Sequence, residues 1–492
     1  MSQLHSIKIL ALGAKLAAVA QPAFPAASFE VFKGQTGADL DQAATRADLV
    51  LIEGDGQHVE AVTSAIQRLS RLSPQPAVIL TGAGIPIALV RAMLKLQRSD
   101  ILEAPFNPDE LARAAAPLMR TAEPASDAMP LLDPESSGAP ANSTWADAVP
   151  ETGIEVFSGL ADELAAGFAG TDRLYGFAHH RSDTTWLGTS TGIRRRWTQP
   201  TGSIEINGKR GNGNDPASAW VGAPTTDFTD IGVTGLLAEL SRRLDWCTRR
   251  VELPAGRYPT LLPPSAVADL LIPMLWSMDG RGAHEGHTAF ARAGGTRVGE
   301  RLTDIPLTLY SDPRAAGLEY RPFVATTASS EMISIFDNGL ATDRVDWLRD
   351  GAIAALVYPR SAAAQFDAPV TPPGDNLLLS GGTDTSLEQM IAGTERGLLL
   401  TCLWYIREVD PATLLQTGLT RDGVYLVEDG TVTAAVNNFR FNESPLDLLR
   451  RATEVGATEI TLPREWKDWF TRTAMPPMRI PDFHMSSVSR AT

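Results

Sequence analysis

The residues best suited to metal chemistry lie in the segment GAHEGH, which contains His284, Glu285 and His287. Two imidazoles and a carboxylate could hold a zinc ion, with Glu285 as the general base of a hydrolase, if the fold supplied a third ligand. The histidines are three residues apart, whereas metallopeptidase helices place them four apart, and Gly282 and Gly286 disfavour a helix. The segment is therefore either a metal site or a polar loop. Candidates for the third ligand are Cys402, Asp312 and His484.

The densest basic cluster is Arg194, Arg195 and Arg196, followed by Lys209 and Arg210. Adjacent side chains of a strand point to opposite faces, so one or two of the three arginines would face an interior or an interface. There Arg194 and Arg196 could bind the carboxylates of a peptide or of a partner chain. The alternative is a solvated face of a hairpin.

Amides and aromatic residues alternate in the segment NNFRFNE, which begins at Asn437. A strand with this pattern has one amide-rich face and one aromatic face. The polar face would either bind the backbone of a peptide or form a structural ladder of hydrogen bonds. Its candidate residues are Asn437, Asn438, Arg440 and Asn442.

Nucleophilic catalysis has weaker support. Cys402 lies in the apolar run LLLTCLWYI, where burial would raise the pKa of its thiol. The pair His179 and His180 falls in a strand pattern, so at most one of the two could line a cavity. No GxSxG or P-loop segment appears in a strand-turn-helix context.

Composition excludes several classes of protein. The 492 residues have a net charge of -15, which is the wrong sign for broad contact with nucleic acid. Two cysteines are too few for a disulfide framework and suit a reducing cytoplasm. No run approaches 18 uncharged apolar residues, and Lys15 interrupts the only segment that resembles a signal peptide. We therefore expect a cytoplasmic protein of several domains.

Residues 1–120 contain five short apolar runs, most of them followed by helical patterns, which predicts a doubly wound parallel sheet. The pattern resembles a response-regulator receiver domain, in particular the degenerate receivers of CpaE-type pilus-assembly proteins. Receiver phosphorylation needs an acidic pair after the first strand, an acceptor Asp after the third and a Lys after the fifth.

The chain has Gly13 and Ala14 at the position of the acidic pair, Glu53 or Asp55 near the acceptor, and Ala104 in place of the Lys. Without these groups Mg²⁺ and the phosphoryl oxygens are not held. We therefore interpret the domain as a docking or dimerisation module that has no phosphoacceptor.

Residues 121–150 hold five prolines, five acids and no base, which predicts a linker. Residues 151–260 then predict an antiparallel sheet with a packed helix, and residues 261–492 a β-rich domain. The expected fold class is α/β followed by α+β.

Residues 151–492 resemble the TldD/PmbA family, once described as modulators of DNA gyrase. The resemblance lies in several blocks: 253–271 (LPAGRYPTLLPPSAVADLL), 295–313, 334–339, 394–430, 434–449 and 479–489. It implies a heterodimeric peptidase for unfolded or small peptides, in which a TldD-like chain carries zinc on an HExxxH helix and a PmbA-like chain lacks the metal.

The corresponding helix here reads SAVADLLIPMLWSM, with no His and no Glu. The resemblance therefore implies a PmbA-like chain that binds no cofactor, with the zinc in a TldD-like partner, and no membrane or nucleic-acid partner. Two alternatives stay open. The chain could itself be a zinc peptidase that uses the HEGH segment, or the receiver-like domain could serve chiefly to recruit a partner.

Overall fold

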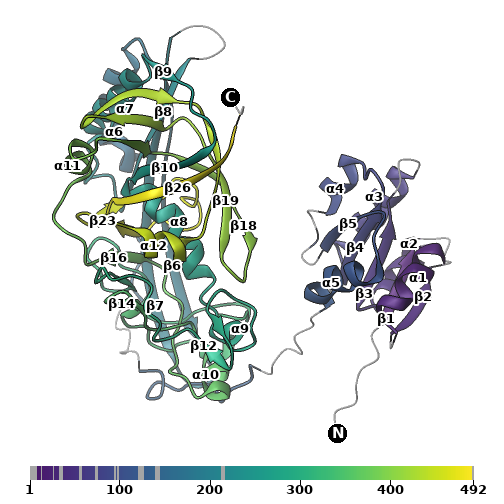
Figure 1. Cartoon of the computed structure of the whole chain (residues 1–492). Helices are drawn as coiled ribbons and strands as arrows, with labels where there is room; N and C mark the ends of the chain where they lie inside the picture. The colour runs from purple at the N-terminus through teal and green to yellow at the C-terminus, as the bar shows by residue number, and fades with distance from the viewer. Residues whose placement is uncertain are drawn as a thin grey trace. The chain divides into compact units, whose positions relative to one another are not determined.

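In the computed structural model the chain forms two compact units, Met1–Ser126 (unit 1) and Asp127–Thr492 (unit 2). The structure describes residues 8–12, 14–25, 27–32, 37–54, 58–72, 76–93, 96, 99–119, 127–138, 145–211 and 216–489. Figure 1 shows the course of the chain through the two units.

Unit 1 contains a parallel sheet in the order β2-β1-β3-β4-β5. This is the strand order of flavodoxin and CheY, so the prediction of a doubly wound, receiver-like fold is confirmed. One apolar core lies on each face of the sheet, because both faces of a parallel sheet are covered by helices. The strands are β1 (Lys8–Leu12), β2 (Ser28–Val31), β3 (Leu49–Glu53), β4 (Ala77–Gly82) and β5 (Ser99–Glu103). The helices are α1 (Ala14–Ala20), α2 (Gly37–Ala44), α3 (Val59–Leu69), α4 (Ile87–Met93) and α5 (Pro108–Met119).

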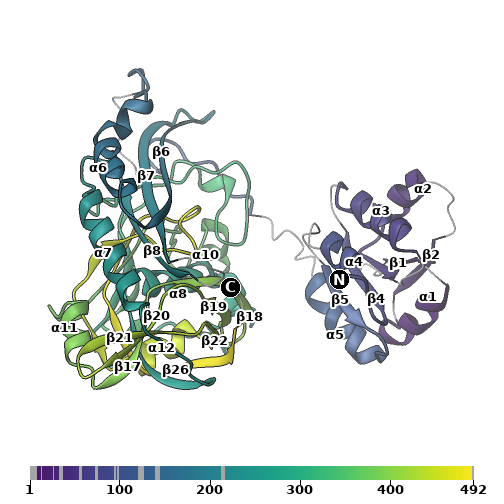
Figure 2. The ribbon, with the colours of Figure 1, turned by 90° about the horizontal axis from the view of Figure 1, so that it is seen from above.

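Unit 2 begins with an antiparallel sheet of three strands, β6 (Arg173–Gly188), β7 (Arg194–Arg210) and β8 (Ala217–Thr225), in that order. Two helices, α6 (Ser158–Phe168) and α7 (Val233–Trp246), lie along one face of it (Figure 2). A buried cluster that includes Ile204, Ile206 and Leu240 joins the helices to the sheet. The predicted sheet with a packed helix is confirmed.

The remainder of unit 2 is β-rich, as predicted, and its two larger sheets share one core. The ten-stranded sheet contains β9 (Arg250–Val251), β10 (Gly256–Leu262), β17 (Arg396–Leu400), β18 (Leu403–Asp410), β19 (Leu415–Thr420), β20 (Val424–Glu428), β21 (Thr431–Val436), β22 (Phe439–Glu443), β23 (Glu454–Val455) and β26 (Met478–Val488). The six-stranded sheet contains β13 (Thr308–Ser311), β14 (Val345–Arg349), β15 (Ala352–Ile353), β16 (Leu377–Ser380), β24 (Glu459–Thr461) and β25 (Thr473–Met475). The helices are α8 (Pro264–Trp276), α9 (Gly280–His284), α10 (Arg360–Phe366), α11 (Leu387–Ala392) and α12 (Pro445–Arg451).

The domain limits expected at residues 121–150 and 260 differ from these units. Residues 127–138 pack on unit 2 rather than extending as a free linker. Arg360 Nη1 donates to the carbonyl of Pro130 at 3.0 Å, and Arg195 Nη2 donates to Ser137 Oγ at 2.8 Å. Strand β10 crosses position 260 and pairs with β17 and β26, so the chain has no boundary there.

In the ranges that the structure describes, no helix combines the length and the apolar character needed to span a membrane.

Candidate functional site

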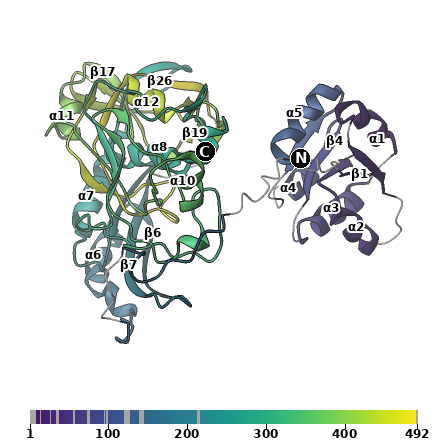
Figure 3. The ribbon, with the colours of Figure 1, turned by 90° about the horizontal axis from the view of Figure 1, so that it is seen from below.

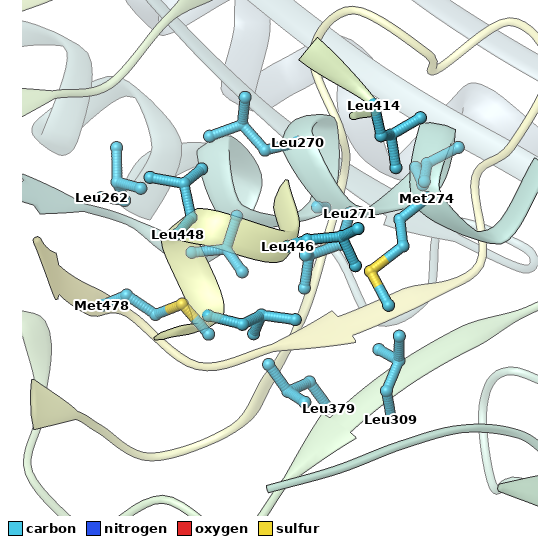
Figure 4. Close-up of a cluster of buried hydrophobic side chains, with 14 of the residues drawn as sticks. Leu262, Leu270, Leu271, Met274, Leu309, Leu379, Leu414, Leu446, Leu448 and Met478 are labelled. Atoms are coloured by element: carbon cyan, nitrogen blue, oxygen red, sulfur yellow. The ribbon is translucent and has the colours of Figure 1, made fainter. Parts of the chain in front are cut away.

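Helix α8 occupies the position where a metal-binding helix was considered, and it is buried in the main core. Pro263 and Pro264 begin the helix, and ten of its residues are buried. Leu270, Leu271 and Met274 pack among side chains of α12 and of both large sheets (Figure 4). The apolar character predicted for this helix is confirmed.

Asp269 is the exception on this apolar helix, and the sequence interpretation overlooked it. Its side chain is completely buried, and Oδ1 accepts a hydrogen bond from the backbone N–H of Glu465 at 2.8 Å. Oδ2 is buried without a hydrogen-bond partner among the described residues. Burial raises the pKa of this carboxyl well above its ordinary value, which favours the neutral form.

The residues around Asp269 do not fit a zinc ion. A zinc site needs at least three ligands, whereas helix α8 carries no His, Cys or Glu and Asp269 is its single acid. The nearby Cys402 thiol is buried, and that burial raises its pKa to about 12. Within the described ranges, no three His, Cys, Asp or Glu side chains gather closely enough to hold a metal ion.

Gly282 lies inside a short helix, contrary to expectation, but the helix ends at His284. Glu285, Gly286 and His287 lie outside it, so the two histidines do not share a helix. Helix α9 spans Gly280–His284, and Asp279 caps it by accepting hydrogen bonds from the N–H groups of Arg281 and Gly282. A Cβ at position 282 would lie 2.5 Å from Asp279 Oδ2, so glycine is what permits the cap. Burial raises the pKa of Asp279 to about 6.

The side chains of the HEGH segment contact different groups and do not converge on one point. The ring of His284 stacks on Phe366 with centroids 4.2 Å apart, whereas His287 Nδ1 lies 3.5 Å from Glu285 Oε2. Of the three residues considered as third ligands, Cys402 is buried beside Asp269, and His484 lies on β26. The backbone N–H of Asp312 donates to Asn376 Oδ1, and its carbonyl accepts from Asn376 Nδ2. The structure therefore does not bring this set together.

The arginine cluster also lies in contacts within the chain. Arg195 and Arg196 are both buried. Because adjacent residues of a strand point to opposite faces, both faces of β7 are covered at this point. Arg196 Nη2 donates to the carbonyl of Ala148 at 2.9 Å, and Arg194 lies over the ring of Trp145. Ser137, Trp145 and Ala148 thus supply contacts for the arginines that the sequence had left open to a peptide, a partner chain or solvent.

The amide block shows the predicted alternation. Phe439 and Phe441 are fully buried, whereas Arg440 and Asn442 point to the opposite, more exposed face of β22. Arg440 Nη1 donates to Thr417 Oγ1 at 3.3 Å. Arg440 and Asn442 therefore lie on the open face of the ten-stranded sheet.

Asn437 and Asn438 line a cavity of about 770 Å³, which we call the Asn437 cavity. It lies where β9, β20 and β21 approach the end of α7 and the start of β8. The pairing of β9 with β21 brings residues 250–254 beside 436–438, and the N–H of Leu253 donates to Asn437 Oδ1 at 2.7 Å. Sequence reasoning missed the other polar groups that line this cavity, namely Cys247, Arg250, Glu252 and Asp422.

Charged groups of both signs, amides and backbone groups line the Asn437 cavity. Burial raises the pKa of the Cys247 thiol, so it is protonated and is not an activated nucleophile.

Residues 255–487 match the sequence profile of the PmbA/TldA metallopeptidase C-terminal domain. This part of the chain is a PmbA/TldA-type domain. A candidate modulator of DNA gyrase from Bacteroides thetaiotaomicron is similar in structure, with 18% identity, a TM-score of 0.57, and coverage of 77% of this chain and 83% of that one. TldE from Thermococcus kodakarensis is similar at 16% identity and a TM-score of 0.55, over 77% and 85% of the two chains.

The pilus-assembly protein CpaE from Caulobacter crescentus also matches, at 22% identity and a TM-score of 0.19, over 23% of this chain and 98% of that one. No curated protein matches the chain in sequence. At these identities the structural matches to the PmbA/TldA-type proteins establish the fold of unit 2, and the function has to be argued from its residues.

In unit 1, Glu53 and Ala104 lie next to strand ends, where a receiver domain has its phosphoacceptor and its Lys. Glu53 is exposed at the end of β3, Ala104 follows β5, and Thr81 is buried at the end of β4. Gly13 and Asp55 lie outside the described residues.

Acetyl phosphate and Mg²⁺ should leave the full chain unmodified, because the methyl group of Ala104 cannot neutralise the phosphoryl oxygens. Intact-mass spectrometry measures this directly. One acid-labile phosphate per chain that disappears in Glu53→Gln or Asp55→Asn would contradict the prediction.

Proposed function

We propose that the chain is the metal-free member of a two-chain peptidase of the TldD/PmbA type, which acts on unfolded or small peptides. In this proposal a homologous TldD-like partner carries the zinc, and the present chain supplies part of the chamber wall and a peptide-binding cavity. The observation that carries the proposal is helix α8, in which a neutral, fully buried Asp269 is the only acid and apolar side chains occupy the rest of the core-facing surface.

The division of roles follows from what each step requires. Bond cleavage needs a Lewis acid and an activated water, and one chain of a pair is enough to supply both. Peptide binding needs polar groups that match a backbone, together with charges for side chains and termini. The Asn437 cavity offers these through Asn437, Arg250 and Glu252.

This chain's own residues would bind and orient the peptide. The Asn437 side chain is positioned by the N–H of Leu253, so its amide is preorganised at the cavity wall. Arg250 and Glu252 flank it from β9 and the residue after it, and they would pair with a peptide's acidic and basic groups. The receiver-like unit would then serve to dock the assembly to a further partner.

The purified chain should hold less than one zinc per molecule after dialysis and should show little peptidase activity, whereas turnover of a flexible peptide should appear when a TldD-like chain is added. Elemental analysis and a fluorogenic peptide assay measure the two. Turnover by the pair should be lost when the partner's zinc ligands are replaced. It should persist in His284→Ala, because His284 stacks on Phe366.

Two variants of this chain complete the experiment. Arg250→Glu reverses a charge in the Asn437 cavity and should raise the KM of the pair for acidic peptides severalfold. Arg292→Glu, on the short strand β11 (Ala291–Arg292), should not. Stoichiometric zinc that is lost in a His284→Ala, His287→Ala double variant, or full turnover without a partner, would overturn the proposal.

A further inference from the structure

Strand β6 is a long edge strand of its sheet. The order β6-β7-β8 leaves one side of its 16 residues without a neighbouring strand in the described part of the chain. Its pairing with β7 runs from Arg173 to Gly188 without a bulge, and the strand contains no Pro and no Lys. Monomeric proteins usually protect an edge by one of these devices, because free N–H and C=O groups pair readily with another strand.

The two faces of β6 differ in a way that fixes how a second strand could pair. Leu174 and Ala178 point to the helices α6 and α7 and join the core. The odd-numbered residues point away, and Tyr175 and Phe177 are 54% and 59% exposed. Figure 3 shows the β6–β7 hairpin and the helices from below. A strand added at the edge would extend the sheet and place its own outer-face side chains beside Phe177.

Arg181 and Asp183 stand next to each other on the outer face, at the middle of the strand. Their side chains form an ion pair at 2.5 Å and are 58% and 52% exposed. In an antiparallel pair of identical strands with the two-fold axis at Ser182, Arg181 of one copy lies directly opposite Asp183 of the other. Opposite charges at facing positions stabilise such a pair.

Neighbouring registers are disfavoured by the same charges. An axis at Arg181 would place Arg181 opposite Arg181, and an axis at Asp183 would place Asp183 opposite Asp183. Like charges that face each other across strands are destabilising. The register centred on Ser182 also places Phe177 opposite Leu187, so an apolar pair flanks the charges on each side.

We propose that the β6 edge is an interface with a second copy of this chain, in which two β6 strands pair antiparallel about Ser182 and join the three-stranded sheets into one. The interface is isologous, as expected of a two-fold dimer. The inference rests on the edge and its charge pattern alone, and it does not depend on the proposed peptidase function.

Sedimentation velocity on the full chain, over a range of concentrations, tests the interface. The wild type should dimerise. Asp183→Arg places four arginines together and Arg181→Asp places four aspartates together, so each single variant should weaken association by at least about tenfold. An equimolar mixture of the two variants should dimerise again, because each strand then faces its complement. The double variant R181D/D183R should also dimerise.

Arg173→Asp is the matched control, because it changes the net charge as Arg181→Asp does but lies beyond the overlap of the two strands. It should dimerise like the wild type. Circular dichroism checks that each variant is folded, as expected for exposed positions. A wild type that is monomeric at every concentration, or a dimer that both single variants leave intact, would overturn the proposal.

Discussion

Arg451→Met should lower the free energy of unfolding of unit 2 by about 3–5 kcal/mol at pH 8. The guanidinium of Arg451 pairs with the carboxylate of Glu443, which is 3% exposed at the end of β22. Burial raises the pKa of Glu443, and Arg451 opposes that shift. The variant therefore leaves an uncompensated charge in the core. Urea unfolding followed by tryptophan fluorescence reports on unit 2 alone, since all ten tryptophans lie between Trp145 and Trp469.

The adjacent Arg450 is the matched control. Its side chain is 38% exposed and pairs with Asp447 and Glu300 at the surface, so Arg450→Met should change stability by about 0–1 kcal/mol. The deficit of Arg451→Met should shrink as the pH falls, because a buried acid with a raised folded-state pKa is tolerated once it is protonated. Equal losses in the two variants, or a loss that does not vary with pH, would contradict this account.

The features that the sequence predicted correctly depend on local periodicity. Alternation along β22 placed Phe439 and Phe441 in the core, because successive residues of a strand point to opposite faces. Residues 264–276 are apolar almost throughout, and this composition predicted an apolar helix. The five-stranded parallel sheet of unit 1 followed from strands and helices that alternate along the chain.

Contacts between distant segments explain what the sequence did not show. Arg195 is buried because Ser137, far from it along the chain, receives its hydrogen bond. The Asn437 cavity forms because β9 pairs with β21, which brings residues 250–254 beside Asn437. Neither the Arg195–Ser137 hydrogen bond nor the β9–β21 pairing produces a periodic pattern in the sequence. The unusual pair of amides at positions 437 and 438 did indicate one wall of the cavity.

Helix α9 was not expected from the glycine content of its segment. Glycine weakens a helix through backbone entropy, and on that ground the HEGH segment was expected to be a loop. The carboxylate of Asp279 outweighs this effect by accepting two backbone hydrogen bonds in the first turn. The Asp residue before the segment was the signal that could have identified the helix.

Asp269→Asn should stabilise unit 2 at pH 8, and by more than it does at pH 4. The Asp269 carboxyl is completely buried, and its pKa is raised well above the ordinary value by that burial. A raised folded-state pKa means that the stability contributed by the neutral acid is present at low pH and is lost as the pH rises. An Asn retains the acceptor for the N–H of Glu465 and never ionises, so the advantage of the variant should grow from pH 4 to pH 8.

Asp468→Asn is the control, because Asp468 lies in the same segment as Glu465 and its side chain is 65% exposed. It should leave the stability of unit 2 nearly unchanged at both pH values. Thermal unfolding followed by tryptophan fluorescence gives the two curves for each protein. If Asp269→Asn is less stable than the wild type at pH 8, Asp269 is ionised and held by a partner. Helix α8 would then present a charged ligand rather than a neutral one, and the strongest argument against a metal at this position would be lost.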